Sequence, residues 1–477
     1  MAQQRPHRPQ LTVLPTLVHE TLYVGIDVGK FKHIAGFVSA TLLAQHQRFE
    51  ACPVLAFDQS RAGFRAFVDR IRAFVPLEHA YVVLEHTGHY HKALAQYLLE
   101  LDIAVYVIHV QKRPPGMLKS DKRDALGLAN QLYNQLEKGM QLADKCQVVR
   151  RLLPPTSAAA HLKGLTRHRY ELSGECARRK TKLTAICDEL FPEFTEVFRD
   201  PNAPMALAYR EHYPTPHALA TASFDALARI RTRNRPSNVQ LVQLQELASQ
   251  SIGTHDVDRQ RSLVLEQDQL IRELRLMQAH IQQLDSEIST IMAHCREGQI
   301  VTSIPGIGTI QAATILSAIG NILNFDSAAA LKSYCGWAPT IVQSGISMGQ
   351  ARLTPRGTRT MKQMMFLVVA HAIQLDCEWA TLYARLVPRK CVYDERTRMY
   401  KGKLTVMGRI AGQMLEMIYA LLKQDAERVS ATPPGMSPPD PIVYNRAIHH
   451  AHRTGHYQPI KPRRHPATIL QLPPRAG

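Results

Sequence analysis

The chain has 477 residues, is 45% hydrophobic, and carries a formal net charge of +18 with a pI of about 9.6. This length is sufficient for two or three domains with their own cores, and the hydrophobic content excludes a wholly disordered protein. A positive surplus of this size indicates a polyanionic partner, and nucleic acid is the usual one. The longest apolar run, residues 364–370, is far too short to span a bilayer, so no membrane partner is expected.

The eight cysteines include no C-x-x-C pair, and they therefore indicate neither a zinc site nor a disulfide framework. We expect reduced and mostly buried thiols, as in a cytoplasmic protein. Residues 1–20 lack the apolar core of a signal peptide and are expected to form a flexible N-terminal tail.

The first clear element is a strand that begins at Leu22, in which aliphatic side chains alternate with Tyr23, Gly25, Asp27 and Gly29. The two glycines are expected to leave open space beside Asp27. Such space suits a metal ion or a phosphate that must approach the backbone. The alternative is an ordinary aspartate at a strand end or turn.

The following segments predict an α/β domain over residues 21–145, in the order strand, strand, strand, helix, strand, helix, strand, helix. A strand at 33–38 forms a hairpin with the first one, and a third near 53–57 completes a meander. Ser60 caps a helix whose apolar face carries Phe64, Phe67, Ile71 and Phe74. The remaining elements are a strand at 81–84 that ends at Glu85, a helix at 89–101, a strand at 103–110, a break at 114–116 and a helix from Asp121.

Four carboxylates stand at meaningful places in this order. Asp27 is on the first strand, Glu85 ends the fourth, and Asp121 and Asp124 lie one turn apart on a helix. Converging carboxylates are unfavourable unless a cation neutralises them, and Mg²⁺ prefers such oxygen ligands. Two such ions can activate a nucleophile and stabilise a leaving oxygen in phosphodiester chemistry. The alternative takes Asp121 as an N-cap, Asp124 as a first-turn charge and Glu85 as a loop residue.

The segments YVGIDVGK, VVLEHTGHY and KSDKRDALGLA resemble the D-E-D-D set of the RuvC-like domain, an RNase H fold, in the insertion-sequence-110 family of bacterial transposases. The resemblance implies that Asp27, Glu85, Asp121 and Asp124 are catalytic acids that coordinate Mg²⁺.

Residues 157–191 have the pattern of a helix with cations interleaved among its apolar positions and few acids nearby. A basic helix of this density can track a phosphate backbone, and an ordinary solvated face is an equal alternative. The predicted nucleic-acid contacts are Lys163, Arg167, Arg169, Arg178, Arg179 and Lys180, with Lys182 beside them in the pattern.

Residues 201–254 are less regular and contain a basic loop, RTRNRPSN. From Leu263 to Ile291, apolar residues then recur at three- and four-residue spacings, and Gln267 alone interrupts the seam. This pattern predicts a coiled coil or a long helical hairpin, whose partner is either the basic helix of the same chain or another subunit. Residues 146–298 are therefore expected to form a helical, coiled-coil region.

Residues 299–425 contain the second candidate for chemistry, in a mainly helical domain. The segment SIPGIGTIQAATILSAIG predicts a turn, a helix and a turn, with Gly306 and Gly308 in a tight hairpin. The backbone N–H groups of such a helix-hairpin-helix element bind phosphate without reading bases. A simple corner between two helices is the alternative.

Ser344 lies in a loop between Pro339 and a basic helix start. An exposed serine among guanidinium groups suits a nucleophile that attacks a phosphodiester, because arginines hold the phosphate and stabilise developing charge. Ser347 competes for this role, and a plain turn serine is the other alternative. The basic residues assigned to the helix start are Arg352, Arg356, Arg359 and Lys362.

Residues 304–372 look like the C-terminal transposase domain of the same family, with its P-G-I-G segment, its Y-x-G-x-x-P turn, and a serine-glycine pair followed by a basic helix. The resemblance implies that Ser344 becomes covalently joined to DNA. Many members carry a second small residue and a second glycine around this serine, whereas this chain reads QSGIS from residue 343.

The sequence therefore predicts an α/β domain followed by all-α regions, in an insertion-sequence transposase that cuts and rejoins donor and target DNA. The resemblance also implies an element-encoded bridge RNA, a homo-oligomer (dimer or tetramer), and a place at the bacterial nucleoid. One alternative is a Mg²⁺-dependent, structure-specific endonuclease in which water is the nucleophile, and another is a non-catalytic nucleic-acid-binding protein. Residues 426–477, rich in proline, histidine and arginine, are expected to form a mobile basic tail.

Overall fold

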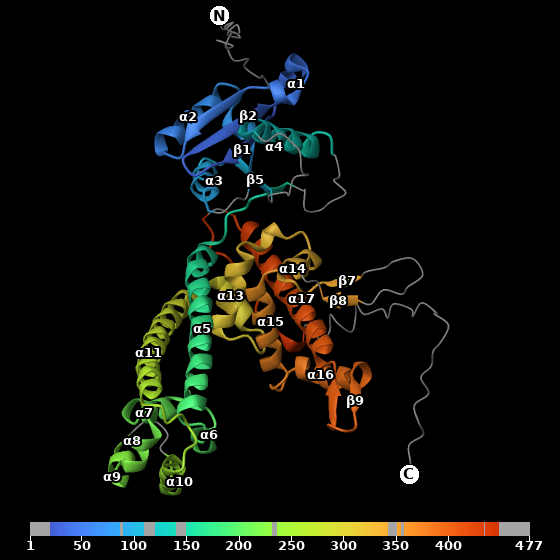
Figure 1. Ribbon diagram of the computed structural model, residues 1–477. Coiled ribbons are helices and arrows are strands. Elements are labelled where there is room, and N and C mark those ends of the chain that lie inside the picture. Colours follow the sequence, from blue (N-terminus) through green and yellow to red (C-terminus); the bar gives the residue numbers. More distant parts are fainter. Residues whose placement is uncertain are drawn as a thin grey trace, which may run out of the picture. The chain divides into compact units, whose positions relative to one another are not determined.

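The computed structural model describes residues 20–85, 89–108, 120–139, 149–230, 236–341, 351–353, 357–433 and 435–447 (Figure 1). The chain divides into two compact units, Met1–Thr156 and Ser157–Gly477. The first is mixed α/β and the second is mostly helical. The predicted N-terminal tail is residues 1–20, and all of it except Glu20 lies outside the described residues.

The first unit is built on a six-stranded sheet, in the order β3-β2-β1-β4-β5-β6 within the described chain. β1, β2 and β3 form an antiparallel meander, β4 and β5 run parallel to β1, and β6 pairs antiparallel with β5. The strands are β1 (Leu22–Val28), β2 (Lys32–Val38), β3 (Val54–Asp58), β4 (Ala80–Glu85), β5 (Ala104–Ile108) and β6 (Arg150–Arg151).

The helices of this unit confirm the predicted order and add one helix that the sequence pattern missed, α1. Ser60 and Ser120 cap α2 and α4, each with its side chain accepting a backbone N–H three residues on. The helices are α1 (Ala40–His46), α2 (Arg61–Arg72), α3 (His91–Leu99) and α4 (Asp121–Leu136), with short 3₁₀ turns η1 (Phe49–Ala51) and η2 (Leu77–His79).

The core of the first unit lies between the sheet and its helices. The predicted apolar face of α2 is buried against β2 and β3, where the rings of Phe57 and Phe67 stack with centroids 4.6 Å apart. Phe37 and Phe74 complete this aromatic layer at 5.3 Å. Burial of each such side chain contributes about 1.5–3 kcal/mol to the free energy of folding.

Helix α4 lies directly on β1 and β2 because both strands present a glycine to it. A Cβ atom at Gly25 would come within 2.2 Å of the Ala125 carbonyl oxygen, and one at Gly36 within 2.8 Å of the Leu126 backbone nitrogen. The expectation that the glycines beside Asp27 leave open space is therefore wrong for Gly25, and also for Gly29, where a Cβ would lie 2.3 Å from the Lys32 carbonyl oxygen. The space that a side chain at Gly25 would need is occupied by the backbone of α4, the helix that carries Asp121 and Asp124.

The second unit begins with two long antiparallel helices, α5 (Ser157–Leu190) and α11 (Val257–Ala293), which we call the helical arm (Figure 1). Arg169 pairs with Asp285 near one end, and Glu189 pairs with Arg259 at the other, which sets the antiparallel register. The sequence pattern left two possible packing partners for α11, the basic helix of the same chain or another subunit. In the described chain α11 packs against α5, the basic helix of the same chain.

The segment that was expected to be irregular instead forms short helices with a core of their own. Tyr209 is fully buried there, and its hydroxyl donates to the Leu227 carbonyl oxygen at 2.8 Å. The predicted basic loop covers residues 231–238. Residues 231–235 lie outside the described residues, and at its end Ser237 caps α10, which begins at Asn238. The helices are α6 (Phe194–Val197), α7 (Pro204–His212), α8 (Pro216–Thr221), α9 (Phe224–Arg229) and α10 (Asn238–Ser249).

The rest of the second unit packs around α17, with a buried cluster that includes Trp379 and the inner faces of α13 and α15. The mainly helical character expected of this region is confirmed, and the hairpins β7–β8 and β9–β10 are additions that the pattern did not predict. The elements are α12 (Arg296–Thr302), α13 (Thr309–Ile319), η4 (Ile322–Asn324), α14 (Ala328–Cys335), β7 (Pro339–Ile341), β8 (Ala351–Leu353), α15 (Arg359–Ala372), α16 (Glu378–Lys390), β9 (Val392–Asp394), β10 (Met399–Lys401) and α17 (Lys403–Ser430).

The expected mobile tail is corrected at its beginning. Helix α17 continues to Ser430, past the predicted start of the tail at residue 426. Ile442 and Tyr444 pack against the core, and their backbone N–H groups donate to Asp425 and Ser303 at 3.2 and 2.8 Å. A few apolar side chains are thus enough to hold this proline-rich segment, while residues 448–477 lie outside the described residues.

Cysteines in the described chain are free thiols, and all but Cys391 are buried, as expected. Burial raises the pKa of Cys335 to about 12 and that of Cys187 to about 11, so these thiols stay protonated near neutral pH. Within the same residues, none of the helices is long and apolar enough to cross a membrane.

We expect Gly25→Ala to lower the free energy of unfolding by about 1–3 kcal/mol, because the backbone of α4 must move to admit the methyl group. Gly127→Ala is the matched control on α4 itself, where an added Cβ meets nothing within 4 Å. The control should be stabilising by about 0.5–1 kcal/mol through helix propensity. Urea unfolding of both variants measures this, and equal effects would contradict the packing of α4 on β1.

Candidate active site

Asp27 and Glu85 lie side by side at one edge of the sheet. β1 and β4 are parallel neighbours, and their register pairs Ile26 with Leu84, so Asp27 and Glu85 are the next residues in step. Both are half-buried. The carboxyl ends of parallel strands share one edge, and the fold therefore brings these two carboxylates together although 58 positions separate them in the sequence.

Helix α4 brings the other two acids toward the same edge, because it runs antiparallel to β1. Its C-terminal end lies at Tyr23, whose hydroxyl donates to Glu137 at 2.6 Å. Its middle lies over Gly25. The first turn of α4 therefore extends toward the end of β1 that carries Asp27. In that turn Asp124 is half-buried and Asp121 is exposed.

The reading of Asp121 as an N-cap is wrong. Ser120 holds the cap position, with extended backbone and its hydroxyl accepting the Arg123 N–H at 3.3 Å. Arg123 itself points to Glu50, at 3.6 Å. Asp121 and Asp124 are thus first-turn acids at the positive end of the helix dipole, which favours a negative charge there by about 0.3–1 kcal/mol.

The four acids have the donor chemistry that Mg²⁺ prefers, and three of them, Asp27, Glu85 and Asp124, are half-buried. Among the described residues, no group of three or more His, Cys, Asp or Glu side chains is placed to hold a metal ion. The four acids therefore fit the metal in chemical kind, but their described side chains are not gathered closely enough to hold it.

A buried histidine, which the sequence pattern did not single out, stabilises the turn after Asp27. His33 is fully buried, and its Nδ1 accepts the Gly29 N–H at 3.3 Å. Nε2 therefore carries the proton and donates to Gln59 Oε1, and the Gln59 amide donates to the Tyr90 carbonyl oxygen at 3.0 Å. This chain of bonds joins the β1–β2 turn to the start of α3, just beyond Glu85.

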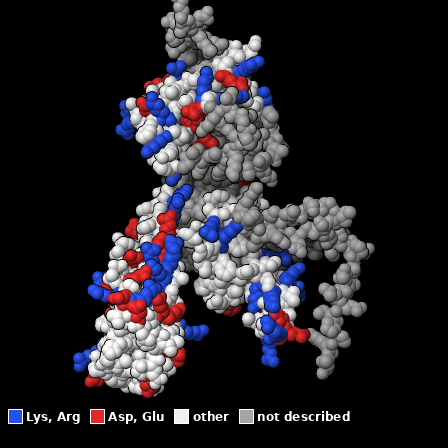
Figure 2. Space-filling view, viewed as in Figure 1, with Lys and Arg blue, Asp and Glu red and all other residues white. Residues whose placement is uncertain are grey.

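Most of the cations on α5 that were predicted to contact nucleic acid form ion pairs with acidic side chains. Figure 2 shows Lys and Arg interleaved with Asp and Glu along the arm. The expectation of few acids nearby is wrong, because Glu171 and Glu175 of α5 itself and three acids of α11 pair with these cations. Lys163 and Lys180 have no acidic partner within the described chain. The ion pairs are Arg167–Glu171, Arg169–Asp285, Arg178–Glu175, Arg179–Glu175, Arg179–Glu273 and Lys182–Glu266.

The predicted phosphate-binding hairpin is a tight turn between α12 and α13. Gly306 has φ +91° and is buried against Ala372, where a Cβ would come within 2.5 Å of the Ala372 Cβ. The N–H of Gly308 donates to Gln311 Oε1 at 2.7 Å, which caps α13. Gly308 is exposed and Gly306 is not, so only the Gly308 side of the turn faces solvent.

The predicted serine region is described only at its base. Ser344, Ser347 and Arg356 lie outside the described residues. Arg352 lies on β8, so assigning it to the helix start is wrong, because α15 begins at Arg359 after Thr358. Arg359 is exposed and Lys362 is half-buried in the first turn of that helix.

Two glycines of the predicted motifs close the base of the β7–β8 hairpin. Gly336, with φ +78°, ends α14 before β7, and Gly357, with φ +101°, follows β8. A Cβ at Gly357 would lie 2.4 Å from the Gly336 Cα, so the two backbones touch. The contact therefore joins the end of α14 to the residues just before α15.

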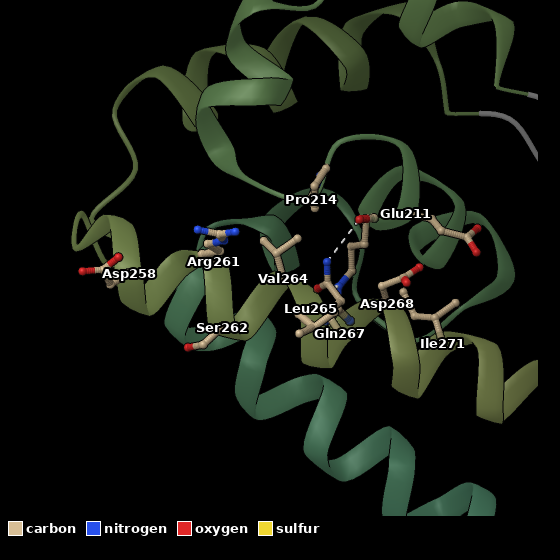
Figure 3. A pocket seen from close by; sticks show the side chains of 11 residues that line it. Glu211, Pro214, Asp258, Arg261, Ser262, Val264, Leu265, Gln267, Asp268 and Ile271 are labelled. Carbon is tan, nitrogen blue, oxygen red and sulfur yellow. Dashed lines mark hydrogen bonds between the residues drawn. The ribbon is translucent and has the colours of Figure 1, made fainter.

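The interruption of the apolar seam by Gln267 has a structural reason. Arg210 is only 4% exposed, and its Nε donates to Gln267 Oε1 at 2.9 Å, while the Gln267 amide donates back to the Arg210 carbonyl oxygen at 3.1 Å. Both residues line a cavity of about 650 Å³ between α7 and α11, and Figure 3 shows Gln267 in its wall. Burial lowers the pKa of the Arg210 guanidinium.

Two family models match this chain. One, described as Transposase IS116/IS110/IS902 family, matches residues 298–384. The other, for DEDD transposases of IS110 and described as Transposase, matches residues 24–192. The first of these ranges spans the predicted serine region, and the second contains all four acids.

Among curated proteins, the 43.6 kDa protein of insertion element IS110 from Streptomyces coelicolor is 24% identical over 325 residues, which are 68% of this chain and 75% of that protein. The 42 kDa protein of IS900 from Mycobacterium paratuberculosis is 24% identical over 57% of this chain and 66% of its own length. The 44.8 kDa protein of IS116 from Streptomyces clavuligerus is 22% identical over 47% and 57%.

Stability is expected to fall as the pH drops below about 6.5, the ordinary pKa of histidine. Burial lowers the pKa of His33 in the folded chain, so below pH 6.5 the unfolded chain binds a proton that the folded one does not. Protonation would also remove the acceptor for Gly29. His33→Gln should flatten this slope, by up to about 1.4 kcal/mol per pH unit, whereas exposed His79→Gln should not. Equal slopes in denaturant titrations from pH 5 to 8 would contradict the assignment.

We expect Gln267→Leu to lower the free energy of unfolding by about 1–3 kcal/mol although it completes the apolar seam, because it removes an acceptor from a buried guanidinium. Gln269→Leu, at an exposed position of the same helix, should change it by less than about 0.5 kcal/mol. A stabilising Gln267→Leu would show that the Arg210 contact is dispensable.

Proposed function

Because the chain belongs to the IS110 family of transposases, enzymes that act on DNA, we propose that it cuts and rejoins DNA strands with an acidic magnesium site and a serine nucleophile. The observation that carries this proposal is the pairing of two acids at one sheet edge, with the first turn of α4 directed toward them. Asp27 and Glu85 end adjacent parallel strands, and α4 extends its two acids toward them.

We further propose that the first unit is an RNase H-like domain of the RuvC type. The strand order supports this: three antiparallel strands are followed by two strands parallel to the first, with β1 in the centre and α4 across it. A sheet of this order places the ends of β1 and β4 next to each other, which is where the proposed chemistry needs its acids.

Asp27, Glu85, Asp121 and Asp124 would hold the Mg²⁺ ions, which supply charge neutralisation at a phosphodiester and activation of an attacking oxygen. The chain's own part is to fix the acids in place. The His33 network holds the turn after Asp27, and the contact of α4 with Gly25 sets how close Asp124 comes. In this proposal, these contacts limit how far the carboxylates must move to share a metal ion when nucleic acid binds.

In the serine step, the Ser344 oxygen attacks phosphorus, the bond from phosphorus to the departing strand oxygen breaks, and the strand leaves as a hydroxyl that takes up a proton. The phosphoserine bond conserves the energy of the broken bond, so attack by another strand hydroxyl can rejoin the DNA. Arg359 and Lys362, in the first turn of α15, would hold the phosphate.

The nucleic-acid partners are proposed to be donor DNA, target DNA and an element-encoded bridge RNA, held by a homo-oligomer. The +18 charge supports binding of polyanions. On α5, Lys163 and Lys180 are the favoured phosphate contacts, because the other predicted cations there already pair with acids. The same proposal includes a coiled coil between the helical arms of two subunits.

The test incubates purified protein with element RNA, Mg²⁺ and labelled donor and target DNA, followed by denaturation and a search for protein-linked DNA. We expect an adduct with wild type and with Ser347→Ala, and none with Ser344→Ala. Asp124→Asn should lower cleavage by more than about 100-fold, since loss of outer-shell partners alone costs 10–100-fold. Glu78→Gln, at an exposed position beyond the opposite end of β4, is the control and should be unaffected.

Each arm of the experiment decides a separate point. Cleavage without an adduct, unaffected by Ser344→Ala and abolished by Asp124→Asn, would replace the serine mechanism by a metal-dependent endonuclease with water as nucleophile. An adduct that survives Ser344→Ala but not Ser347→Ala would move the nucleophile. Recombination that proceeds without element RNA would remove the guide from the proposal.

A further inference from the structure

We propose that the hairpin of β9 and β10, here called the basic ribbon (residues 389–403), is a DNA-binding element that enters the major groove of a duplex. It lies outside both ranges matched by the family models, 24–192 and 298–384. The inference rests on the proposed action of the chain on DNA, but it needs neither the acidic site nor the serine.

The basic ribbon has a strong local excess of positive charge. Figure 2 shows Lys and Arg gathered around β9, with one small acidic patch. Lys401 pairs with Asp394 at 2.5 Å, and within the described residues the other five cations of the ribbon form no ion pair. Its six cations, against the acids Asp394 and Glu395, are Arg389, Lys390, Arg396, Arg398, Lys401 and Lys403.

The two faces of the ribbon have different surroundings. Tyr393 and Tyr400 are cross-strand partners on one face, and Tyr400 packs against the core of the unit. Val392 and Met399 lie on the other face, 73% and 58% exposed, together with the Lys401–Asp394 pair. The inner face therefore fixes the ribbon to the body, and the outer face leaves apolar and charged groups available to a partner.

The tip of the ribbon carries two exposed arginines, Arg396 and Arg398. Arg398 has φ +51°, a left-handed conformation that favours glycine or asparagine. An arginine at this position is disfavoured for folding. Arginine is also the side chain best suited to bidentate contact with a phosphate or with the edge of a guanine, which gives the tip a role in recognition.

The shape of the ribbon favours DNA over RNA. Two paired strands lie about 4.8 Å apart, and a two-stranded ribbon fits the major groove of B-form DNA, about 12 Å wide. The major groove of A-form RNA is too narrow and deep for side chains to read. The charge excess is complementary to phosphates on both sides of the groove, and Val392 and Met399 are suited to contact thymine methyl groups.

The experiment measures binding of the full-length protein to a labelled DNA duplex by fluorescence anisotropy, over a series of salt concentrations and with EDTA present. The test variant combines Arg396→Gln with Arg398→Asn. We expect at least tenfold weaker binding, and a slope of log affinity against log salt that is shallower by about two, because two phosphate contacts are lost. Asparagine tolerates the left-handed conformation, so the unfolding temperature should stay equal or rise.

A matched control removes the same charge elsewhere. Arg61→Gln combined with Arg65→Gln changes two exposed arginines on α2, in the first unit, and should leave affinity and slope unchanged. Equal losses in both double variants would reduce the effect to general electrostatics and overturn the proposal. An unchanged slope in the ribbon variant would also overturn it, as would a larger loss of binding to an A-form RNA duplex than to DNA.

Failure of this test and failure of the proposed chemistry are distinguishable. Binding is measured without Mg²⁺, and it can be repeated with Ser344→Ala, which cannot form the proposed adduct. A ribbon variant that binds weakly but forms the adduct at saturating DNA would confirm the ribbon and leave the chemistry intact. If instead wild type binds the duplex, the ribbon variant binds it weakly, and neither forms an adduct, the ribbon proposal would stand and the proposed chemistry would fail.

Discussion

The contact of α4 with β1 is the interaction on which the candidate active site depends. The acids of the site come from three separate elements, and this contact, together with that of α4 on β2, directs the helix turn that carries Asp121 and Asp124 toward Asp27 and Glu85. It is possible because Gly25 has no side chain, so the helix backbone rests on the strand backbone. Any other residue there would lift the helix by the width of a side chain, and the acids on its first turn would move with it.

Electrostatics opposes the arrangement that packing imposes. Carboxylates held at one edge repel one another, and burial raises the cost of their charge. Two features reduce that cost: Asp121 stays exposed, and the first turn of α4 places its acids at the positive end of the helix dipole. A divalent cation would remove the remaining repulsion. The stability of the first unit is therefore expected to be coupled to the occupancy of its acidic edge.

Sequence patterns predicted what depends on local periodicity, and they failed where distant segments meet. Alternation in β1 and the cap at Ser60 gave the strands and helices of the first unit in order. No local pattern could show that α4 covers Gly25, or that Gln267 serves a buried Arg210. Of the short helices after α5, α6, α8 and α9 were missed because four to six residues are too few to establish a helical period. The serine region stays a prediction, because Ser344 lies outside the described residues.

The arm and the basic ribbon show that a count of cations does not locate a binding surface. Arg169 and Arg179 are as basic as any residue of the ribbon, but each pairs with an acid of α11, and these pairs match the antiparallel register of the arm. Arg396 and Arg398 have no such partner within the described chain. A phosphate that approached the arm would have to compete with carboxylates already in place, whereas one that approached the ribbon would only displace water and counterions. To locate a binding surface, the cations without an acidic partner matter more than the total charge of +18. Among the described elements, the basic ribbon concentrates such cations.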